Sequence, residues 1–234
     1  MRDGLKMLGV IGGMGPKATS LFYDMVINHT AADCDQEHIN MVILSFADFP
    51  DRTEAIKSGE TGKMIAAFRN CARILKDIGC ANLAIPCNTA HYYIDDIQKA
   101  SEVPVINMVR ETVDEAIERG AKKIGIMATE GTIQAGIYTA ECRCHGVEAY
   151  NPGPAGQADV TSLIYDDVKS GRPCDPAKFD RVIEEFRDEG CDAVILACTE
   201  LSVFKEEFGM PEFCIDAMDV LVRESIIRSG AEYK

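Results

Sequence analysis

The sequence lacks any long hydrophobic stretch. No apolar run approaches the roughly 20 residues that a membrane-spanning helix needs. The first residues do not follow the basic, apolar and small-residue order of a secretory signal peptide either. We therefore expect a cytoplasmic protein with no membrane partner.

Basic residues are scarce relative to acidic ones. The 234 residues include 24 Lys and Arg against 38 Asp and Glu, which gives a formal net charge of -14 at pH 7. Such a charge repels nucleic acid and anionic membranes, so neither is expected as a partner. It does not exclude a small acidic ligand, because the cations inside a binding site matter more to that ligand than the total charge.

The motifs of several large enzyme classes are also absent. The sequence contains no phosphate-binding loop, no HExxH or GxSxG pattern and no lysine in the setting of a pyridoxal phosphate (PLP) site. Among ten cysteines there is no CxxC pair, and Cys142-Arg143-Cys144-His145 lacks a second ligand pair at zinc-site spacing. We therefore expect reduced thiols, no metal and no cofactor.

The sequence does contain an internal repeat of one segment. Gly79-Cys80 is followed seven residues after its cysteine by Cys87, and Gly190-Cys191 is followed in the same way by Cys198, at an offset of 111 residues. In each copy a helical pattern ends at the glycine, and a short apolar run typical of a buried parallel strand leads to the second cysteine. Cys87 and Cys198 therefore stand where a strand ends and a helix begins, the place where open α/β sheets bind ligands.

This location suggests reactive thiols. The amino end of a helix favours the thiolate over the thiol, so we expect it to activate both Cys87 and Cys198. A single buried cysteine is more often a small core residue. The matched placement of two cysteines favours the catalytic interpretation.

The order of elements repeats as well. An apolar strand at 7–11 leads into Gly12-Gly13-Met14-Gly15-Pro16 and a helix, and a strand at 124–128 leads into Thr129-Glu130-Gly131-Thr132. We predict an α/β fold of two similar Rossmann-like domains with parallel sheets. A pseudo-twofold axis between them would place both cysteines in one cleft, which is the predicted active site.

Two thiols on opposite sides of one carbon atom can invert its configuration. One cysteine removes the proton as a thiolate, and the other returns a proton to the opposite face as a thiol. Backbone amides at the helix amino ends can hold a carboxylate and stabilise the charge that develops as the proton leaves.

The chain resembles members of the cofactor-independent aspartate/glutamate racemase superfamily, on the aspartate racemase side, over essentially its whole length. Four segments carry the resemblance: Gly12-Gly13-Met14-Gly15-Pro16, Pro86-Cys87-Asn88-Thr89-Ala90-His91, Val168-Lys169-Ser170-Gly171 and Cys198-Thr199-Glu200. The resemblance implies that Cys87 and Cys198 are the two bases and that neither PLP nor a metal is needed. It also implies a homodimer and a final segment that returns to the first domain. We accordingly assign residues 1–104 with 211–234 to the first domain and 105–210 to the second.

The resemblance also implies a set of substrate-binding residues. Arg52 and Lys169 would hold the side-chain carboxylate of aspartate or glutamate, whereas taken alone a loop arginine such as Arg52 is more often just solvated. The full set of expected substrate-binding residues is Met14, Arg52, Asn88, Thr89, Thr132, Lys169, Thr199 and Glu200.

The leading hypothesis is an amino-acid racemase acting on aspartate and glutamate. Within the same scaffold, the alternatives are a broad-specificity amino-acid racemase and another carbon-acid isomerase, such as a hydantoin racemase or a maleate isomerase. From other classes, the alternatives are a ligand-binding or sensing protein and a nicotinamide-dependent oxidoreductase. The last is disfavoured because the glycine-rich turn is spaced G-G-x-G and no acidic residue closes a second strand about 20 residues later.

Overall fold

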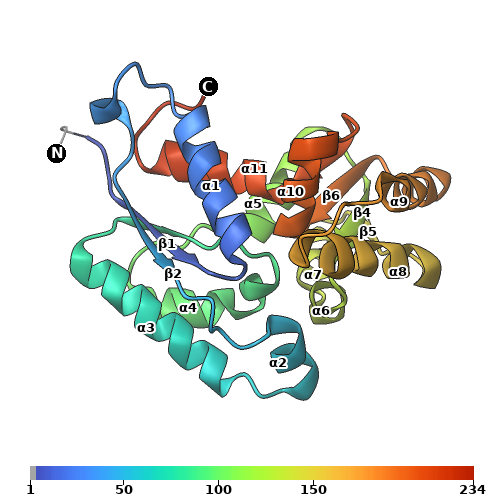
Figure 1. The fold of residues 1–234 in the computed structure, drawn as a ribbon, viewed down its shortest axis with the longest axis horizontal. Helices are drawn as coiled ribbons and strands as arrows, with labels where there is room; N and C mark the ends of the chain where they lie inside the picture. Colours follow the sequence, from blue (N-terminus) through green and yellow to red (C-terminus); the bar gives the residue numbers. More distant parts are fainter. Residues whose placement is uncertain (1–3) are drawn as a thin grey trace. The chain divides into compact units, whose positions relative to one another are not determined.

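The structure is a computed structural model that describes residues 4–234. Contacts divide the chain into two compact units. The first unit is Met1–Met108 together with Met218–Lys234, and the second unit is Val109–Ala217. Each unit has its own parallel sheet with helices on both faces (Figure 1), so the chain has an α/β fold. None of the helices within residues 4–234 is both long and apolar enough to cross a membrane.

The sheet of the first unit has the strand order β2-β1-β3, and all its strands are parallel. The strands are β1 (Leu8–Gly12), β2 (Met41–Ser45) and β3 (Asn82–Ala84). Val105 extends this sheet through an isolated parallel bridge to Leu83. One side of the sheet is covered by α1 (Pro16–His29) and α11 (Ala217–Arg228) (Figure 1). The other side is covered by α3 (Gly62–Ile78) and α4 (Ile94–Ser101).

Burial on both faces explains the composition of the central strand. All five residues of β1 are buried, because helices cover both sides of a parallel sheet. Helix α3 contributes one apolar face, with Met64, Phe68 and Leu75 in the core, and it ends at Gly79, whose φ of 96° is left-handed. The predicted bounds of this helix, 62–78, match the structure.

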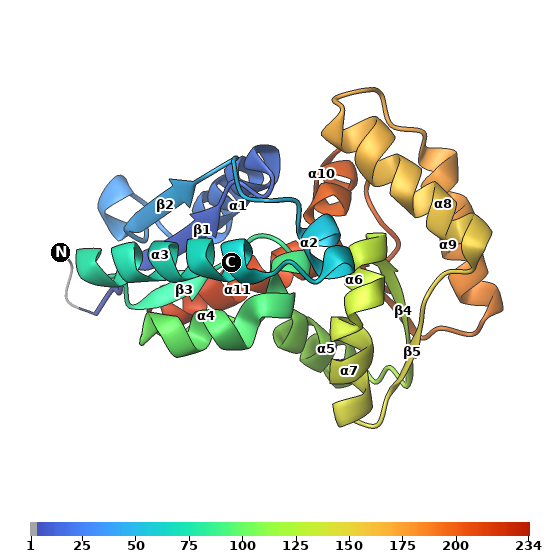
Figure 2. The same ribbon diagram turned by 90° about the horizontal axis from the view of Figure 1, so that it is seen from below.

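The sheet of the second unit has the strand order β5-β4-β6-β7, again all parallel. The strands are β4 (Lys123–Ala128), β5 (Glu148–Tyr150), β6 (Ala193–Ala197) and β7 (Cys214–Asp216). Helices α5 (Met108–Glu118) and α7 (Ile137–Cys144) lie on one side of this sheet (Figure 2). Helices α8 (Pro154–Ser162) and α9 (Pro176–Asp188) lie on the other side. The core on the α9 side includes Phe179, whose ring stacks 5.0 Å from that of Phe204.

The remaining helices lie in the connections between these elements. They are η1 (Asp35–Glu37), α2 (Arg52–Ser58), η2 (Thr89–Tyr93), α6 (Glu130–Ala135), η3 (Leu163–Lys169) and α10 (Thr199–Phe208). η1 and η2 are 3₁₀-helices, whereas η3 is a π-helix that continues α8.

The internal repeat predicted from the sequence is visible in the topology. In both units the first strand pairs with the second and the third, and a fourth segment lies beside the third: Val105 in the first unit and β7 in the second. This pairing also explains why the boundaries fall at 108/109 and 217/218, rather than at the expected 104/105 and 210/211. Val105 bonds to the first sheet, and β7 belongs to the second.

Some short elements differ from the sequence prediction. The helix expected after Cys87 begins as the 3₁₀-helix η2 and becomes α-helical only at Ile94. Strand β5 has three residues with little apolar character, and it was not predicted. Arg52 does not lie in a loop; it opens helix α2, because the Asp51 carboxylate accepts a hydrogen bond from the Glu54 amide at 2.9 Å.

Candidate active site

Cys87 lies just beyond the carboxyl end of β3. The Cys87 amide donates to the Ile85 carbonyl at 2.7 Å, a tight turn that directs the chain into η2. Cys87 is buried, and so are Asn88 and Thr89, the two residues that follow it. The repeated sequence motif therefore places a cysteine, an amide and a hydroxyl together at the ligand-binding edge of the first sheet.

The glycine-rich turn after β1 reaches the same edge of the sheet. Gly13 has a φ of 91°, and a Cβ there would overlap the backbone of Phe46, so the position requires glycine. The Gly13 amide donates to the Thr19 hydroxyl at 2.9 Å, which fixes the turn against α1. Met14 is buried in the apolar cluster that also contains Cys87.

Arg52 retains unused hydrogen-bonding capacity. Its Nη1 donates to the Pro50 carbonyl at 3.0 Å, but its Nε is buried without a hydrogen-bond partner among residues 4–234. The hydroxyl of Tyr93, at the end of η2, is likewise buried and unpartnered among the described residues. Burial raises the pKa of Tyr93, and the positive charge of Arg52 opposes that rise. Two unused donors of the first unit thus lie within electrostatic range of each other, and such groups are costly unless a ligand bonds to them.

Tyr93 was not among the residues predicted from the sequence. Tyr92 and Tyr93 follow the Cys87 motif directly, a position that is compatible with packing or with indirect support of the site. Tyr93 does pack against Phe68, with ring centroids 5.7 Å apart. No sequence signal distinguishes a tyrosine with a satisfied hydroxyl from one without.

In the second unit, Cys198 is the N-cap of α10 and follows β6 directly. Its Sγ donates a hydrogen bond to Glu200 Oε2 at 3.0 Å. Glu200 Oε1 lies 3.7 Å from Lys169 Nζ, which stands 4.6 Å from the centre of the Tyr165 ring. Three of the predicted residues, Cys198, Glu200 and Lys169, are therefore linked into one chain of contacts.

The surroundings of Cys198 raise the pKa of its thiol. Burial raises the pKa of the Cys198 thiol well above its ordinary value, the negative charge of Glu200 raises it further, and Lys169 opposes the rise. The helix amino end favours the thiolate, but loss of solvent has the larger effect on this pKa. These surroundings favour the thiol form of Cys198, which is the form that delivers a proton.

The other predicted residues of the second unit lie at the same edge of its sheet. Thr199 is buried beside Cys198. Thr132 donates its amide to the hydroxyl of Thr129 at 3.2 Å, and the two hydroxyl oxygens lie 3.1 Å apart. Thr129 thus caps α6 directly after β4, as the glycine-rich turn precedes α1 in the first unit.

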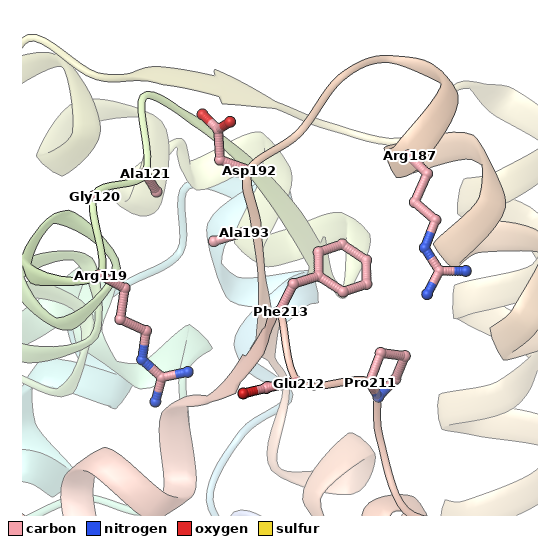
Figure 3. Close-up of a pocket in the computed structure, with 9 residues that line it drawn as sticks. All are labelled: Arg119, Gly120, Ala121, Arg187, Asp192, Ala193, Pro211, Glu212 and Phe213. Atoms are coloured by element: carbon pink, nitrogen blue, oxygen red, sulfur yellow. The ribbon is translucent and has the colours of Figure 1, made fainter.

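A large hollow lies at the opposite edge of the second sheet. It has a volume of about 1020 Å³ and is lined by residues that precede β4, β6 and β7. Figure 3 shows Arg119 and Arg187 on either side of Phe213, and the Arg187 guanidinium lies 5.0 Å from the centre of that ring. Cys198 follows the carboxyl end of β6, so this hollow is separate from the candidate active site.

No cluster of three His, Cys, Asp or Glu side chains within residues 4–234 could hold a metal ion. The Cys142-Arg143-Cys144-His145 segment forms the end of α7, where Cys142 is buried and Cys144 is exposed. Because these two thiols face different surroundings, the segment does not form a metal site.

The local structure of the two cysteine motifs can now be compared with known proteins. A family model described as Asp/Glu/Hydantoin racemase matches residues 11–225, which include both cysteines, the glycine-rich turn and Lys169. The chain belongs to the Asp/Glu/hydantoin racemase family. It is therefore an isomerase of the racemase type.

Individual racemases resemble most of the chain. The broad specificity amino-acid racemase RacX of Bacillus subtilis (strain 168) is 31% identical over 224 residues, covering 94% of this chain and 96% of RacX. The glutamate racemase of Aquifex aeolicus (strain VF5) is 27% identical over 172 residues, covering 72% of this chain and 64% of that protein. Among solved structures, the Picrophilus torridus aspartate racemase has a TM-score of 0.83 and 29% identity, covering 98% of this chain and 96% of that one.

Proposed function

We propose that this racemase interconverts L- and D-aspartate, with glutamate as a second substrate, through Cys87 and Cys198 and without PLP or a metal. One observation carries the proposal: a cysteine follows the third strand of each sheet, at matched positions of a duplicated chain. Similarity to an aspartate racemase over 98% of the chain supports aspartate as the substrate.

In the proposed reaction the two cysteines act on opposite faces of the substrate Cα. One thiolate takes the α-proton, forming an S–H bond as the C–H bond breaks. The other thiol gives its proton to the opposite face, leaving a thiolate. The substrate is inverted, and the two cysteines have exchanged protonation states. Cys198 is the acid in one direction, and the thiolate that it leaves is the base in the reverse direction. Glu200 accepts the hydrogen bond of the Cys198 thiol in the resting state.

The side-chain carboxylate of the substrate requires a cation. Arg52 is the better candidate, because its buried Nε has no partner among the described residues and a guanidinium can bind a carboxylate through two hydrogen bonds. Lys169 is already 3.7 Å from Glu200, so a substrate carboxylate has to share it with that residue. We propose that Arg52 binds the substrate and that Lys169 mainly balances the charge beside Cys198.

The second candidate is a racemase of broad specificity. It is favoured by the 31% identity to RacX and by the engagement of Lys169 with Glu200, which weakens the selection for an acidic substrate. Incubation with each L-amino acid, followed by chiral chromatography, separates the two candidates. Conversion of neutral or basic amino acids as fast as aspartate would favour broad specificity.

The decisive experiment is hydrogen exchange at Cα. With L-aspartate in heavy water and no added cofactor, we expect D-aspartate that carries deuterium at Cα. Cys87→Ser and Cys198→Ser should each abolish racemisation, whereas Cys144→Ala, at an exposed cysteine, should not. Full activity in either serine variant would overturn the two-cysteine mechanism.

Two further outcomes test the rest of the proposal. Binding of aspartate in calorimetry without exchange at Cα would favour a ligand-binding protein instead. Arg52→Ala should raise KM for aspartate more than KM for alanine, and equal effects would remove Arg52 from the site. We also propose that the enzyme is a cytoplasmic homodimer, for which light scattering should give twice the mass of one chain.

A further inference from the structure

His91, four residues after Cys87, holds two separate parts of the first unit. Its Nδ1 lies 2.9 Å from the Cys87 carbonyl oxygen, and its Nε2 accepts a hydrogen bond from the Met108 amide at 3.1 Å. Nε2 also lies 3.5 Å from the Ile106 carbonyl oxygen, a longer contact than the one to Met108. An Nε2 that accepts from Met108 carries no proton, so we assign the proton to Nδ1, which donates to the Cys87 carbonyl. His91 is buried and neutral, and burial lowers its pKa.

Ser202, four residues after Cys198, occupies the matching place in the second unit. It lies on α10, of which Cys198 is the N-cap, and it is completely buried. Its hydroxyl donates to Asp216 Oδ1 at 2.7 Å. The other oxygen of Asp216 pairs with Lys205 Nζ at 3.0 Å. A neutral hydroxyl thus bonds a buried carboxylate, the strong class of side-chain hydrogen bond.

The partners of His91 and Ser202 have one property in common. Met108 is the last residue of the first unit before the chain enters the second, and Asp216 is the last residue but one of the second unit before the chain returns. Each motif therefore contains a residue, one helical turn past its cysteine, that is bonded to the segment where the chain crosses between units.

We infer that His91 and Ser202 are a matched pair of positioning residues that fasten the cysteine-bearing turns to the two crossover segments. This inference rests on the proposed function, because it assigns the two residues to the placement of Cys87 and Cys198. Within residues 4–234 neither side chain forms a hydrogen bond with a cysteine sulfur atom: His91 bonds to backbone, and Ser202 bonds to the carboxylate of Asp216. A shift of either crossover segment therefore displaces the corresponding thiol.

The two bonds of His91 can be removed one at a time. An asparagine amide reaches the place of Nδ1, so His91→Asn keeps a donor for Cys87 and loses the acceptor for Met108. A glutamine amide reaches the place of Nε2, so His91→Gln keeps the acceptor and loses the donor. Ser202→Ala removes the bond to Asp216, and Ser225→Ala is the control, because Ser225 donates to Leu221 at 2.6 Å inside α11.

The first measurement is kcat per folded molecule, with the folded fraction taken from circular dichroism. We expect both His91 variants and Ser202→Ala to lose at least about fivefold in kcat, with a smaller change in KM. A fivefold loss corresponds to the net contribution of about one hydrogen bond. Ser225→Ala should keep its kcat. A purely structural role of His91 and Ser202 would lower stability and leave kcat per folded molecule unchanged, which would overturn the inference.

The second measurement does not depend on racemase activity. Iodoacetamide alkylation of each cysteine is followed peptide by peptide in a mass spectrometer. The His91 variants should change the alkylation rate of Cys87 at least about threefold and leave that of Cys198 unaffected. Ser202→Ala should change the alkylation rate of Cys198 by a similar factor and leave that of Cys87 unaffected. Equal changes at both cysteines, or none, would overturn the inference even if the enzyme racemises aspartate. Should the His91 variants not fold, Ser202→Ala and its control decide the question alone.

Discussion

The contact between Cys198 and Glu200 leads to a prediction that can be worked out in detail. Replacing Glu200 by glutamine removes a negative charge 3.0 Å from the sulfur atom and keeps the size of the side chain. Glu200 raises the pKa of Cys198, second only to burial, so Glu200→Gln should lower that pKa. The new amide can also donate a hydrogen bond to the thiolate.

The expected size follows from Coulomb's law. Two unit charges 3.0 Å apart repel by about 5 kcal/mol at an effective dielectric constant of about 20. Lys169, 3.7 Å from Glu200, already offsets part of this repulsion, which leaves roughly 2 to 3 kcal/mol. The less basic thiolate is also a weaker nucleophile, with a Brønsted coefficient of about 0.4–0.5. Alkylation of Cys198 at pH 8 should therefore become about tenfold faster.

The assay is iodoacetamide labelling followed by quantification of the Cys198 peptide. The exposed Cys34 and Cys144 serve as internal references within the same sample. Glu207→Gln is the matched control, because Glu207 is an exposed acid on the same helix and the substitution changes the net charge equally. Unchanged or slower labelling of Cys198 in Glu200→Gln would refute the assignment of Glu200 as the group that holds the proton on this thiol.

Three further predictions concern stability in urea. Gly13→Ala should lower the free energy of unfolding by about 3 kcal/mol or more, because it combines a left-handed φ with overlap of the Phe46 backbone. Gly59→Ala, at a φ of 73° in open space, should cost only about 1 kcal/mol, and equal costs would contradict the role of Phe46. Tyr93→Phe should raise the free energy of unfolding by about 1 kcal/mol, because the buried hydroxyl has no partner among residues 4–234; a decrease would mean that it has one. Burial holds the pKa of His91 below 6.5, so the unfolded chain binds more protons, and stability should be full above pH 6.5 and fall below it. His91→Gln should show a smaller loss than wild type between about pH 7 and pH 5, and an equal loss would contradict this account.

Much of the fold follows from periodicity and repetition alone. Helix α3 and the β6 strand before Cys198 are long or strongly apolar, so their patterns identify them. Strand β5 has three residues, and its pairing with β4 is set by the surrounding structure rather than by its own sequence. The start of α2 was predictable in principle, since Asp51 and Glu54 have the spacing of a helix capping box.

The candidate site was predictable to a lesser degree. The repeat locates Cys87 and Cys198, because spacing along the chain is all that this inference needs. That Glu200 faces Cys198, and that Lys169 faces Glu200 instead of open solvent, depends on side-chain directions after two different helices. Burial of the Cys198 thiol is likewise a tertiary property, so the direction in which its pKa shifts could not be predicted from the sequence.

The first unit is assembled from two stretches of chain that the whole second unit separates. Its closing bonds come from the late stretch: the Lys6 amide donates to the Ser229 carbonyl at 2.9 Å, and the Asn82 side chain donates to the Arg228 carbonyl at 2.9 Å. During synthesis, the strands of the second unit are therefore all made before α11, which completes the first unit. Until α11 has packed against the first sheet, one of the helices that cover this sheet is missing, and the apolar surface exposed there is prone to aggregation.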